Sequence, residues 1–538
     1  MSLENTKLAE VENPQKKNGI FRKIAVKFFV FLYLIVLGGI GTQLFLGDIL
    51  GDRLALLSNF FARPVVHSSA ESLAIAYASP VNSLDPVNFD PVTQSRLLDV
   101  YQGLVRTNRN LKIESALAVS WGMLDENTWE FRLRPNVKFH NGKILNSADV
   151  VFSLERAKDF PQSQLKNFFS NVTAIKAVDD SRIQIVTSQP DPLLLNKLAV
   201  AFVYPKDFTD FAKPLGTGPY SFVSADSGAM IMERFNDYWG DKPYFQSVNL
   251  KTILDKDERQ QALEQGKVQI LADVPPATVK DLATKGFETV SIPSLEVNFL
   301  MFNVDDPLWQ NVEVRKSIPQ SLEAKVFVDF ANGFAHPIGQ FVSSGIFGFN
   351  PDVAAPAYNL AQAQKDFQTT ASVSLTSEDA LIVTFDYPAE LDVMGQYIQT
   401  QFAALGIDLK LNPLSGQDLQ KKIAEGTSQL YFLGWRSELG DSDDFLSSIV
   451  HSPDGYGFYG QFNGSHYSNA DTDKAIEQSR QELDPKKRLE DLQNLMKKIV
   501  DEDVIGVPLF ESEKVFAYAK NIHFEPRVDG YISAASVQ

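Results

Sequence analysis

The chain has 538 residues, of which 44% are hydrophobic, and this suits a folded protein with a large core and more than one domain. Its net charge of −17 argues against a nucleic-acid-binding protein. The absence of cysteine excludes disulfides, thiolate metal sites, a cysteine nucleophile and a lipid attached through cysteine.

An uncharged stretch near the N-terminus predicts a membrane anchor. Residues 28–47, FFVFLYLIVLGGIGTQLFLG, would span about 30 Å as a helix, the thickness of a bilayer's hydrocarbon core. Five Lys or Arg between positions 16 and 27 precede it, so the positive-inside rule places residues 1–27 in the cytoplasm and the rest outside. A cleaved signal peptide is the alternative, but the run is long for one and no A-x-A-like site follows directly. We expect an uncleaved anchor followed by a tether over residues 48–71.

The first two thirds of the exported part alternate short strands and helices. LAIAYASPVNSLDP predicts a strand that ends in a turn, and WEFRLRPNVKFHNGK alternates like a half-buried strand. SADVVFSLERAKDF predicts a helix with Ser147 as its N-cap. DDSRIQIVTSQP predicts another strand, and KDERQQALEQGKVQILAD predicts a helix closed by Gly266 and then a strand.

The C-terminal third gives the clearest pattern. Strands are predicted at residues 380–386, 407–414 and 428–435, with helices at 392–406 and 415–426 between them. This βαβαβ order predicts a parallel sheet with helices on its faces. Ligands of such sheets bind beyond the carboxyl ends of the strands, so we expect a crevice where the last strand ends. The two segments DTDKAIEQSRQEL and PKKRLEDLQNLMKKIVDED then predict amphipathic helices, and VIGVPLFESEKVFAYA predicts terminal strands.

The stretch GWRSELGDSDDFL (434–446) begins at that crevice and carries four carboxylates. It does not match a calcium loop, which needs glycine at the sixth position. Glu438 in a closed cleft would form a charge-assisted bond with a ligand ammonium, or alternatively a structural ion pair with Arg436. Asp441, Asp443 and Asp444 are typical of an acidic helix start, although we keep Asp441 as a candidate ligand contact.

Other features of the sequence bear on the ligand site and on catalysis. Trp435 would form the floor of a side-chain pocket, or pack in the core. The six histidines form no H-E-x-x-H motif, and there is no phosphate-binding loop or nucleophile elbow. We therefore expect a protein that is not an enzyme and has no cofactor or metal site.

Several motifs together resemble the extracytoplasmic solute-binding proteins of family 5, the oligopeptide- and dipeptide-binding type that serves ABC importers. The resemblance runs from about residue 72 to about 535. The matching motifs, in order, are SLDP (83–86), TWEFRLRPNVKFHNGKILNSADVVFSLER (128–156), GTGPYSFV (216–223), ALEQGKVQI (262–270) and LGWRSELGDSDDFL (433–446).

The resemblance implies an α/β fold with two lobes, of the large type II periplasmic-binding-protein class. It places lobe I at residues 72–297, with an extra subdomain at about 105–188. Lobe II follows at 298–504, and residues 505–538 return to lobe I. Pro319 departs from the family pattern, because it breaks or kinks the first helix of lobe II. The family's lipid-anchored cysteine is also absent, and the span at residues 28–47 takes its place.

The resemblance also implies a function. The protein would capture a peptide, or a similar cationic small solute, and deliver it to ABC permease subunits whose cytoplasmic ATPases hydrolyse ATP. In peptide-binding members an aspartate shortly after the Gly-Trp pair holds the peptide's α-ammonium, and the matching position here is Glu438. Backbone groups of Gly434, Trp435 and Arg436 would pair with the ligand like an added strand.

Two alternatives remain open at this point. The same fold would serve a sensory or chaperone-like binding protein whose output is not uptake. Within uptake, the solute would be a metal chelate, a sugar or an opine instead of a peptide.

Overall fold

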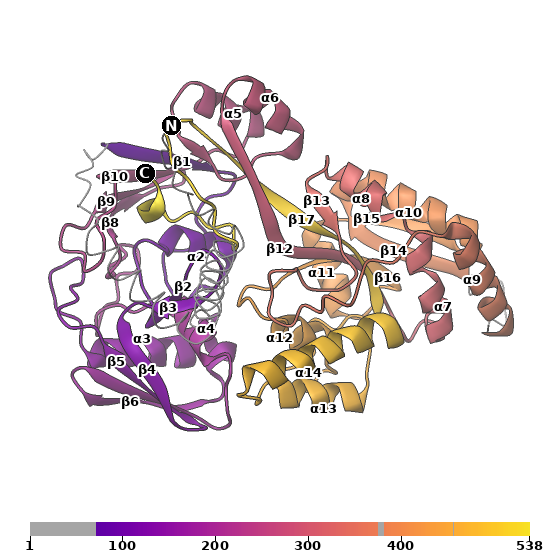
Figure 1. Cartoon of the computed structure of the whole chain (residues 1–538), viewed down its shortest axis with the longest axis horizontal. Coiled ribbons are helices and arrows are strands. Elements are labelled where there is room, and N and C mark those ends of the chain that lie inside the picture. Colours follow the sequence, from indigo (N-terminus) through magenta and orange to yellow (C-terminus); the bar gives the residue numbers. More distant parts are fainter. Residues whose placement is uncertain (1–70, 375–380, 456) are drawn as a thin grey trace, which may run out of the picture. The chain divides into compact units, whose positions relative to one another are not determined.

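The computed structural model describes residues 71–374, 381–455 and 457–538 (Figure 1). The predicted cytoplasmic tail, the anchor at 28–47 and nearly all of the tether lie outside these residues. Among the described residues, no helix has the length and apolar character that a membrane crossing needs. The anchor therefore stays a prediction.

Most strands belong to one mixed sheet, in the order β15-β14-β16-β12-β17-β11-β1-β10-β9-β8, with β13 paired to β17. The bounds of its first members are β1 Ser72–Tyr77, β8 Tyr220–Ala225, β9 Ala229–Arg234, β10 Ser247–Thr252 and β11 Ile270–Leu271. The later members are β12 Glu288–Phe302, β13 Ala335–Pro337, β14 Ile382–Pro388, β15 Asp408–Leu414, β16 Leu430–Arg436 and β17 Gly506–Tyr518. The terminal segment predicted as several strands is the single strand β17.

The two long strands β12 and β17 lie side by side at the middle of this order and connect its two halves (Figure 1). Their antiparallel register shifts between Pro293 and Val297. Within the shift Leu295 has φ +63°, a conformation that non-glycine residues rarely adopt. Such an irregularity bends a strand, so both connections between the halves change direction here.

A separate four-stranded antiparallel sheet has the order β4-β5-β7-β6, and a short hairpin β2-β3 precedes it. The bounds are β2 Val105–Thr107, β3 Ile113–Ser115, β4 Ala118–Asp125, β5 Thr128–Leu133, β6 Val172–Asp179 and β7 Arg182–Thr187. Helix α3 (Ser147–Asp159) packs against this sheet, and Phe131, Val150 and Ile183 are among the residues of their shared core. The N-cap of α3 is Asn146 and not Ser147, because Asn146 and Asp149 form a reciprocal capping box.

The βαβαβ prediction for the C-terminal third is confirmed. Strand β14 is parallel to both β15 and β16, with α10 (Asp392–Leu405) and α11 (Gly416–Ala424) as connections. Gly406 ends α10 with φ +94°, as its position after the last apolar residue predicts. The carboxyl ends of β14 and β16 therefore meet at one edge, which is where the sequence predicts a crevice.

The remaining helices surround these sheets. Their bounds are α2 Pro91–Leu97, α4 Leu194–Val200, α5 Lys256–Glu264, α6 Val279–Thr284, α7 Val312–Ser317, α8 Ala324–Phe330, α9 Leu360–Ser374, α12 Asp443–Phe445, α13 Ala470–Ser479 and α14 Pro485–Lys497. The break at Pro319 is confirmed, since α7 ends at Ser317 and a 3₁₀ turn starts at the proline. The strand predicted over WEFRLRPNVKFHNGK ends at Leu133, because its later half forms a turn.

Candidate ligand-binding site

The last five residues of β16 leave one backbone edge open. On one side β16 pairs with β12 along its whole length, from Leu430 to Arg436. On the other side β14 pairs only with Leu430 and Tyr431. Burial falls in the same direction, from a fully buried Leu430 to an exposed Gly434. The carboxyl end of β16 thus has peptide groups outside the ladder, and these are available to a bound strand.

A cavity of about 780 Å³ lies beside this open edge. Its walls come from β12, β16, β17, α8, α10 and α11, and most are apolar. The apolar lining residues are Phe330, Ala331, Pro388, Leu391, Val393, Met394, Leu419, Ile423, Phe432, Leu433 and Phe510. Among the described residues that line it, Glu296 and Glu390 are charged, and none is lysine, arginine or histidine. The cavity therefore offers apolar surface and negative charge to a ligand.

Glu438 lies just beyond β16 and has partners from two parts of the chain. Its carboxylate forms an ion pair with Arg436, whose Nε lies 2.8 Å away, and accepts a hydrogen bond from the Tyr531 hydroxyl at 3.2 Å. Burial raises the pKa of Glu438 above its ordinary value, and Arg436 and Tyr531 only partly oppose this effect. The structural ion pair considered for Glu438 is therefore present, and the carboxylate remains short of positive charge.

Arg436 connects this group to the C-terminal segment. Its Nη2 donates to the Asp529 carbonyl oxygen at 2.5 Å, while its Nε faces Glu438. Its guanidinium carbon lies 5.6 Å from the centre of the Tyr531 ring. Residues more than 90 positions apart in the chain thus build one polar group at the end of β16.

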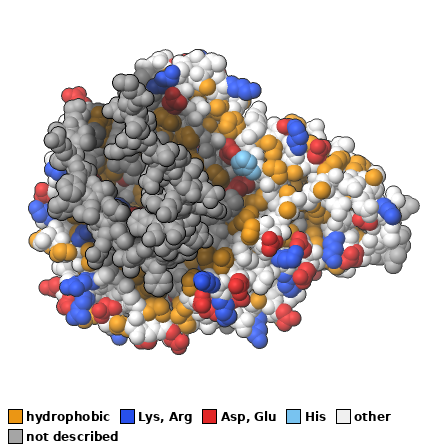
Figure 2. All heavy atoms as spheres, viewed as in Figure 1, with side chains coloured by type: hydrophobic (Ala, Val, Ile, Leu, Met, Phe, Trp, Pro, Cys, Tyr) orange, Lys and Arg blue, Asp and Glu red, His pale blue; other side chains and the backbone are white. Residues whose placement is uncertain are grey.

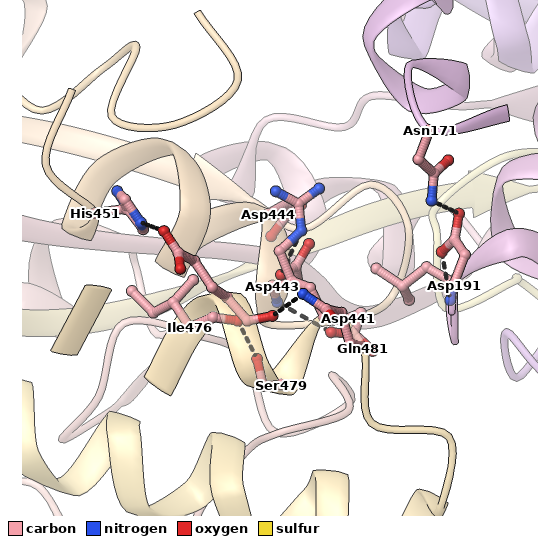
Figure 3. A network of polar contacts seen from close by, with 12 residues as sticks. Asn171, Asp191, Asp441, Asp443, Asp444, His451, Ile476, Ser479 and Gln481 are labelled. Carbon is pink, nitrogen blue, oxygen red and sulfur yellow. Dashed lines mark hydrogen bonds and ion pairs between the residues drawn. The ribbon is translucent and has the colours of Figure 1, made fainter. Parts of the chain in front are cut away.

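Asp441 is buried and forms a two-pronged ion pair. Its two carboxylate oxygens accept from Arg488 of α14 at 2.6 and 2.9 Å. Burial raises the pKa of Asp441, although Arg488 opposes the effect. The pair fixes the loop after β16 onto α14, and Figure 3 shows Asp441 in this network beside Asp443 and Asp444.

Asp443 and Asp444 begin α12, as the acidic start predicts. Asp443 lies 3.4 Å from Arg480 Nε, and the Asp444 carboxylate accepts from the Ser437 hydroxyl at 3.0 Å. Burial raises the pKa of Asp444 well above its ordinary value.

Trp435 packs against two phenylalanines. Its ring centre lies 6.5 Å from that of Phe445 and 5.8 Å from that of Phe462. Its buried indole nitrogen has no hydrogen-bond partner among the described residues. The structure thus gives Trp435 core contacts and a donor that is still unsatisfied.

A second cavity, of about 400 Å³, lies between the loop after β16 and the segment around α4. Asp191 and Lys197 line one side of it, and Asp443, Asp444 and Arg480 line the other. Next to it the Asn196 amide donates to the Leu439 carbonyl oxygen at 2.8 Å. This bond joins two parts of the molecule whose cores are separate.

Sequence reasoning missed Glu296, Asn298 and the residues around α4. Glu296 and Asn298 interrupt an apolar strand, SLEVNFLMF, and alternate toward one face of β12. That alternation indicates two polar side chains on one face of β12. Their position beside Gly434 could not be predicted, because β16 is far from β12 in the sequence. No group of three or more His, Asp or Glu in the described part of the chain is placed to hold a metal ion.

Comparison with known proteins gives consistent results. A family model described as "Bacterial extracellular solute-binding proteins, family 5 Middle" matches residues 112–457. The glutathione-binding protein GsiB of Salmonella typhi is 26% identical over 499 residues, which cover 87% of this chain and 94% of that protein.

Two solved structures show the same fold. One is DppA from Helicobacter pylori in complex with the peptide STSA, with a TM-score of 0.71, 23% identity, and coverage of 86% of this chain and 98% of that one. The other is MoaA from A. tumefaciens R10 in complex with mannopinic acid, with a TM-score of 0.69, 25% identity, and coverage of 87% and 99%. The three similar proteins differ in what they bind.

Proposed function

The chain belongs to family 5 of the bacterial extracellular solute-binding proteins, whose members bind a solute and deliver it to ABC permeases, and from this premise we propose that its own solute is a peptide or a similar small cation. The similar proteins are solute-binding proteins and not enzymes, which agrees with the absence of catalytic motifs.

One observation carries the proposal. The open edge of β16 lies beside a large apolar cavity, and Glu296 and Glu390 are the charged residues among the described ones that line it. An extended peptide can pair its backbone with such an edge and bury a side chain in such a cavity. The carboxylates of Glu296 and Glu390 would repel an anionic solute, and none of the described lining residues is basic.

The proposed contacts follow from this arrangement. Backbone groups of Gly434, Trp435 and Arg436 pair with the peptide backbone. The Trp435 ring packs against Phe445 and Phe462 and does not line the 780 Å³ cavity, so we propose that it supports the binding strand instead of forming the floor of that cavity. Glu438 receives the peptide's α-ammonium, which adds to the single positive charge that Arg436 now supplies. Asp441 acts through Arg488, by holding the loop that carries Glu438 in place.

The proposed architecture keeps the predicted boundaries. Lobe I comprises residues 72–297 and 505–538, with the subdomain at about 105–188, and lobe II comprises 298–504. The continuous strands β12 and β17, with their shared irregularity, support a hinge between the lobes. We also keep the anchor at residues 28–47, with the binding domain outside the cell membrane and the ATPases inside.

Figure 2 bears on the choice of partner. On the part of this face that is not drawn in grey, side chains of Asp, Glu, Lys and Arg are interspersed and form no broad basic surface. Together with the net charge of −17 this supports a small-solute partner over a nucleic acid.

Native mass spectrometry of the full-length protein, purified from its own cells in mild detergent, tests the proposal. We expect a co-purifying peptide, and a rise in melting temperature when a mixture of short peptides is added to the stripped protein. Mannopinic acid serves as the comparison ligand. A protein that carries no peptide, shows no shift with peptides and is stabilised by the opine would contradict the proposal.

A further inference from the structure

Arg436 has two carboxylates as neighbours but can neutralise only one of them. Its Nε is 2.8 Å from Glu438, and it lies directly opposite Glu296 in the register of β16 and β12. Glu296 forms no ion pair with any described residue, although it is partly buried. The nearby Asp529 is already paired with Arg527. Glu296 thus has the Asn298 amide as a hydrogen-bond donor but no ion-pair partner among the described residues, and burial raises its pKa.

The side chain of Asn298 hydrogen-bonds Glu296 and faces the same space. Asn298 is 6% exposed, and its amide nitrogen donates to the Ser512 hydroxyl at 2.8 Å. This bond turns the amide oxygen toward Gly434, where it would lie 3.1 Å from an added Cβ, and no described residue donates to it. A Glu296 oxygen would lie 3.3 Å from the same point.

An Asn298 oxygen and a Glu296 oxygen thus face one space over the exposed Gly434. A buried carbonyl oxygen and a carboxylate that face one space are complementary to an ammonium group, which has three donors and no acceptor. The same space opens into the 780 Å³ cavity, whose other walls are mainly aliphatic and aromatic. The group that enters must therefore combine an apolar body with a positive end.

We propose that Glu296 and the Asn298 amide oxygen bind the side-chain ammonium of a ligand that carries lysine, ornithine or a similar amine on an aliphatic stem. The inference rests on the proposed function and narrows it, because the ligand then has a second positive group besides its α-ammonium. The stem packs along the apolar walls, as long cationic side chains do elsewhere.

The test compares tripeptides of alanine in which one position is either lysine or norleucine, which has the same stem length without the amine. Affinities for the full-length protein are measured by calorimetry for each of the three positions. We expect lysine to bind at least tenfold more tightly than norleucine at one position. Glu296→Gln should remove this preference and leave norleucine binding nearly unchanged. Glu296→Asp, which keeps the charge, should retain part of the preference.

Glu390→Gln is the matched control, because Glu390 lines the same cavity at its exposed rim. We expect it to preserve the lysine preference. The inference is overturned if the unaltered protein binds lysine and norleucine peptides equally, or if Glu390→Gln removes the preference as fully as Glu296→Gln. In both cases peptide binding itself would still support the proposed function, whereas a protein that binds none of the peptides contradicts both proposals.

Discussion

Arg436 is central to the polar group at the end of β16, because it pairs with Glu438 and donates to Asp529 of the C-terminal segment. Glu438 could be chosen from the sequence as a candidate ligand contact, because it follows a Gly-Trp pair at the end of a predicted strand. Glu296 could not be selected in this way. It meets Arg436 only through the pairing of two strands about 140 residues apart, and no local pattern encodes that pairing.

Replacement of Glu438 tests its proposed role. Glu438→Gln should weaken peptide binding by roughly 1.5–3 kcal/mol, as the loss of a charge-assisted hydrogen bond does. Glu425→Gln, on the exposed end of α11, is the matched control and should change nothing. Calorimetry measures the affinity of each variant for a peptide and for the N-acetylated form of that peptide. Equal losses for the two forms would exclude Glu438 as the ammonium partner.

The same residue predicts a pH dependence of binding. Burial raises the pKa of Glu438, so its carboxylate becomes protonated at a less acidic pH than an ordinary glutamate. Only the ionised form binds an ammonium strongly, and affinity should therefore fall as the pH is lowered. The fall should be smaller in Glu438→Gln. Affinity that rises on acidification would contradict this assignment.

Asp99 gives a prediction for stability. It accepts bonds from the Ser533 hydroxyl and the Ala534 amide, both at 2.6 Å, and burial raises its pKa from 3.8 to about 6. Between pH 3.8 and about 6, Asp99 is mostly protonated in the folded state and mostly ionised in the unfolded state. The free energy of unfolding therefore falls as the pH rises through this window. The contribution is roughly 3 kcal/mol across this window, at about 1.4 kcal/mol per pKa unit. Urea unfolding from pH 3 to 8 should show a weaker fall in Asp99→Asn.

At the scale of elements, local signals account for what was predicted correctly. Glycine stops, side-chain caps and apolar strands are encoded within a few residues, and they predict β14, α10, β15, α11 and β16 in the right order. The capping of α3 was misplaced by one residue, because both Asn146 and Ser147 are suitable caps. The antiparallel pairing of β12 with β17 was not predicted, since more than 200 residues separate the two strands.

The ion pair between Asp441 and Arg488 connects the loop after β16 to α14, and it should be a large contributor to stability. Both side chains are at most 5% exposed, so Asp441→Asn leaves a buried guanidinium without its carboxylate. We expect a loss of about 3–5 kcal/mol. Glu482→Gln is the control, because its partner Lys487 is 65% exposed, and it should cost less than about 1 kcal/mol. Chemical denaturation measures the free energy of unfolding of both variants, and equal losses in the two would contradict this prediction.

At the scale of the whole molecule, the hydrogen bond from Asn196 to Leu439 joins the two sides of the 400 Å³ cavity. If this bond stabilises the ligand-bound arrangement, Asn196→Ala should weaken binding by about 2- to 10-fold, mainly through faster release. Asn167→Ala, at an exposed position on the same cavity, is the control. Stopped-flow measurement of association and release separates the two rates, and an effect confined to association would contradict this role.

The position of Tyr531 also sets when the polar group at the end of β16 can form. Its hydroxyl donates to Glu438, which lies 93 residues earlier in the chain, and Arg436 donates to Asp529 over the same separation. Because synthesis and export both proceed from the N-terminus, this polar group cannot assemble until the segment with Asp529 and Tyr531 has emerged. A chain that stalls before Asp529 would contain β16 and Glu438 without the partners that position them.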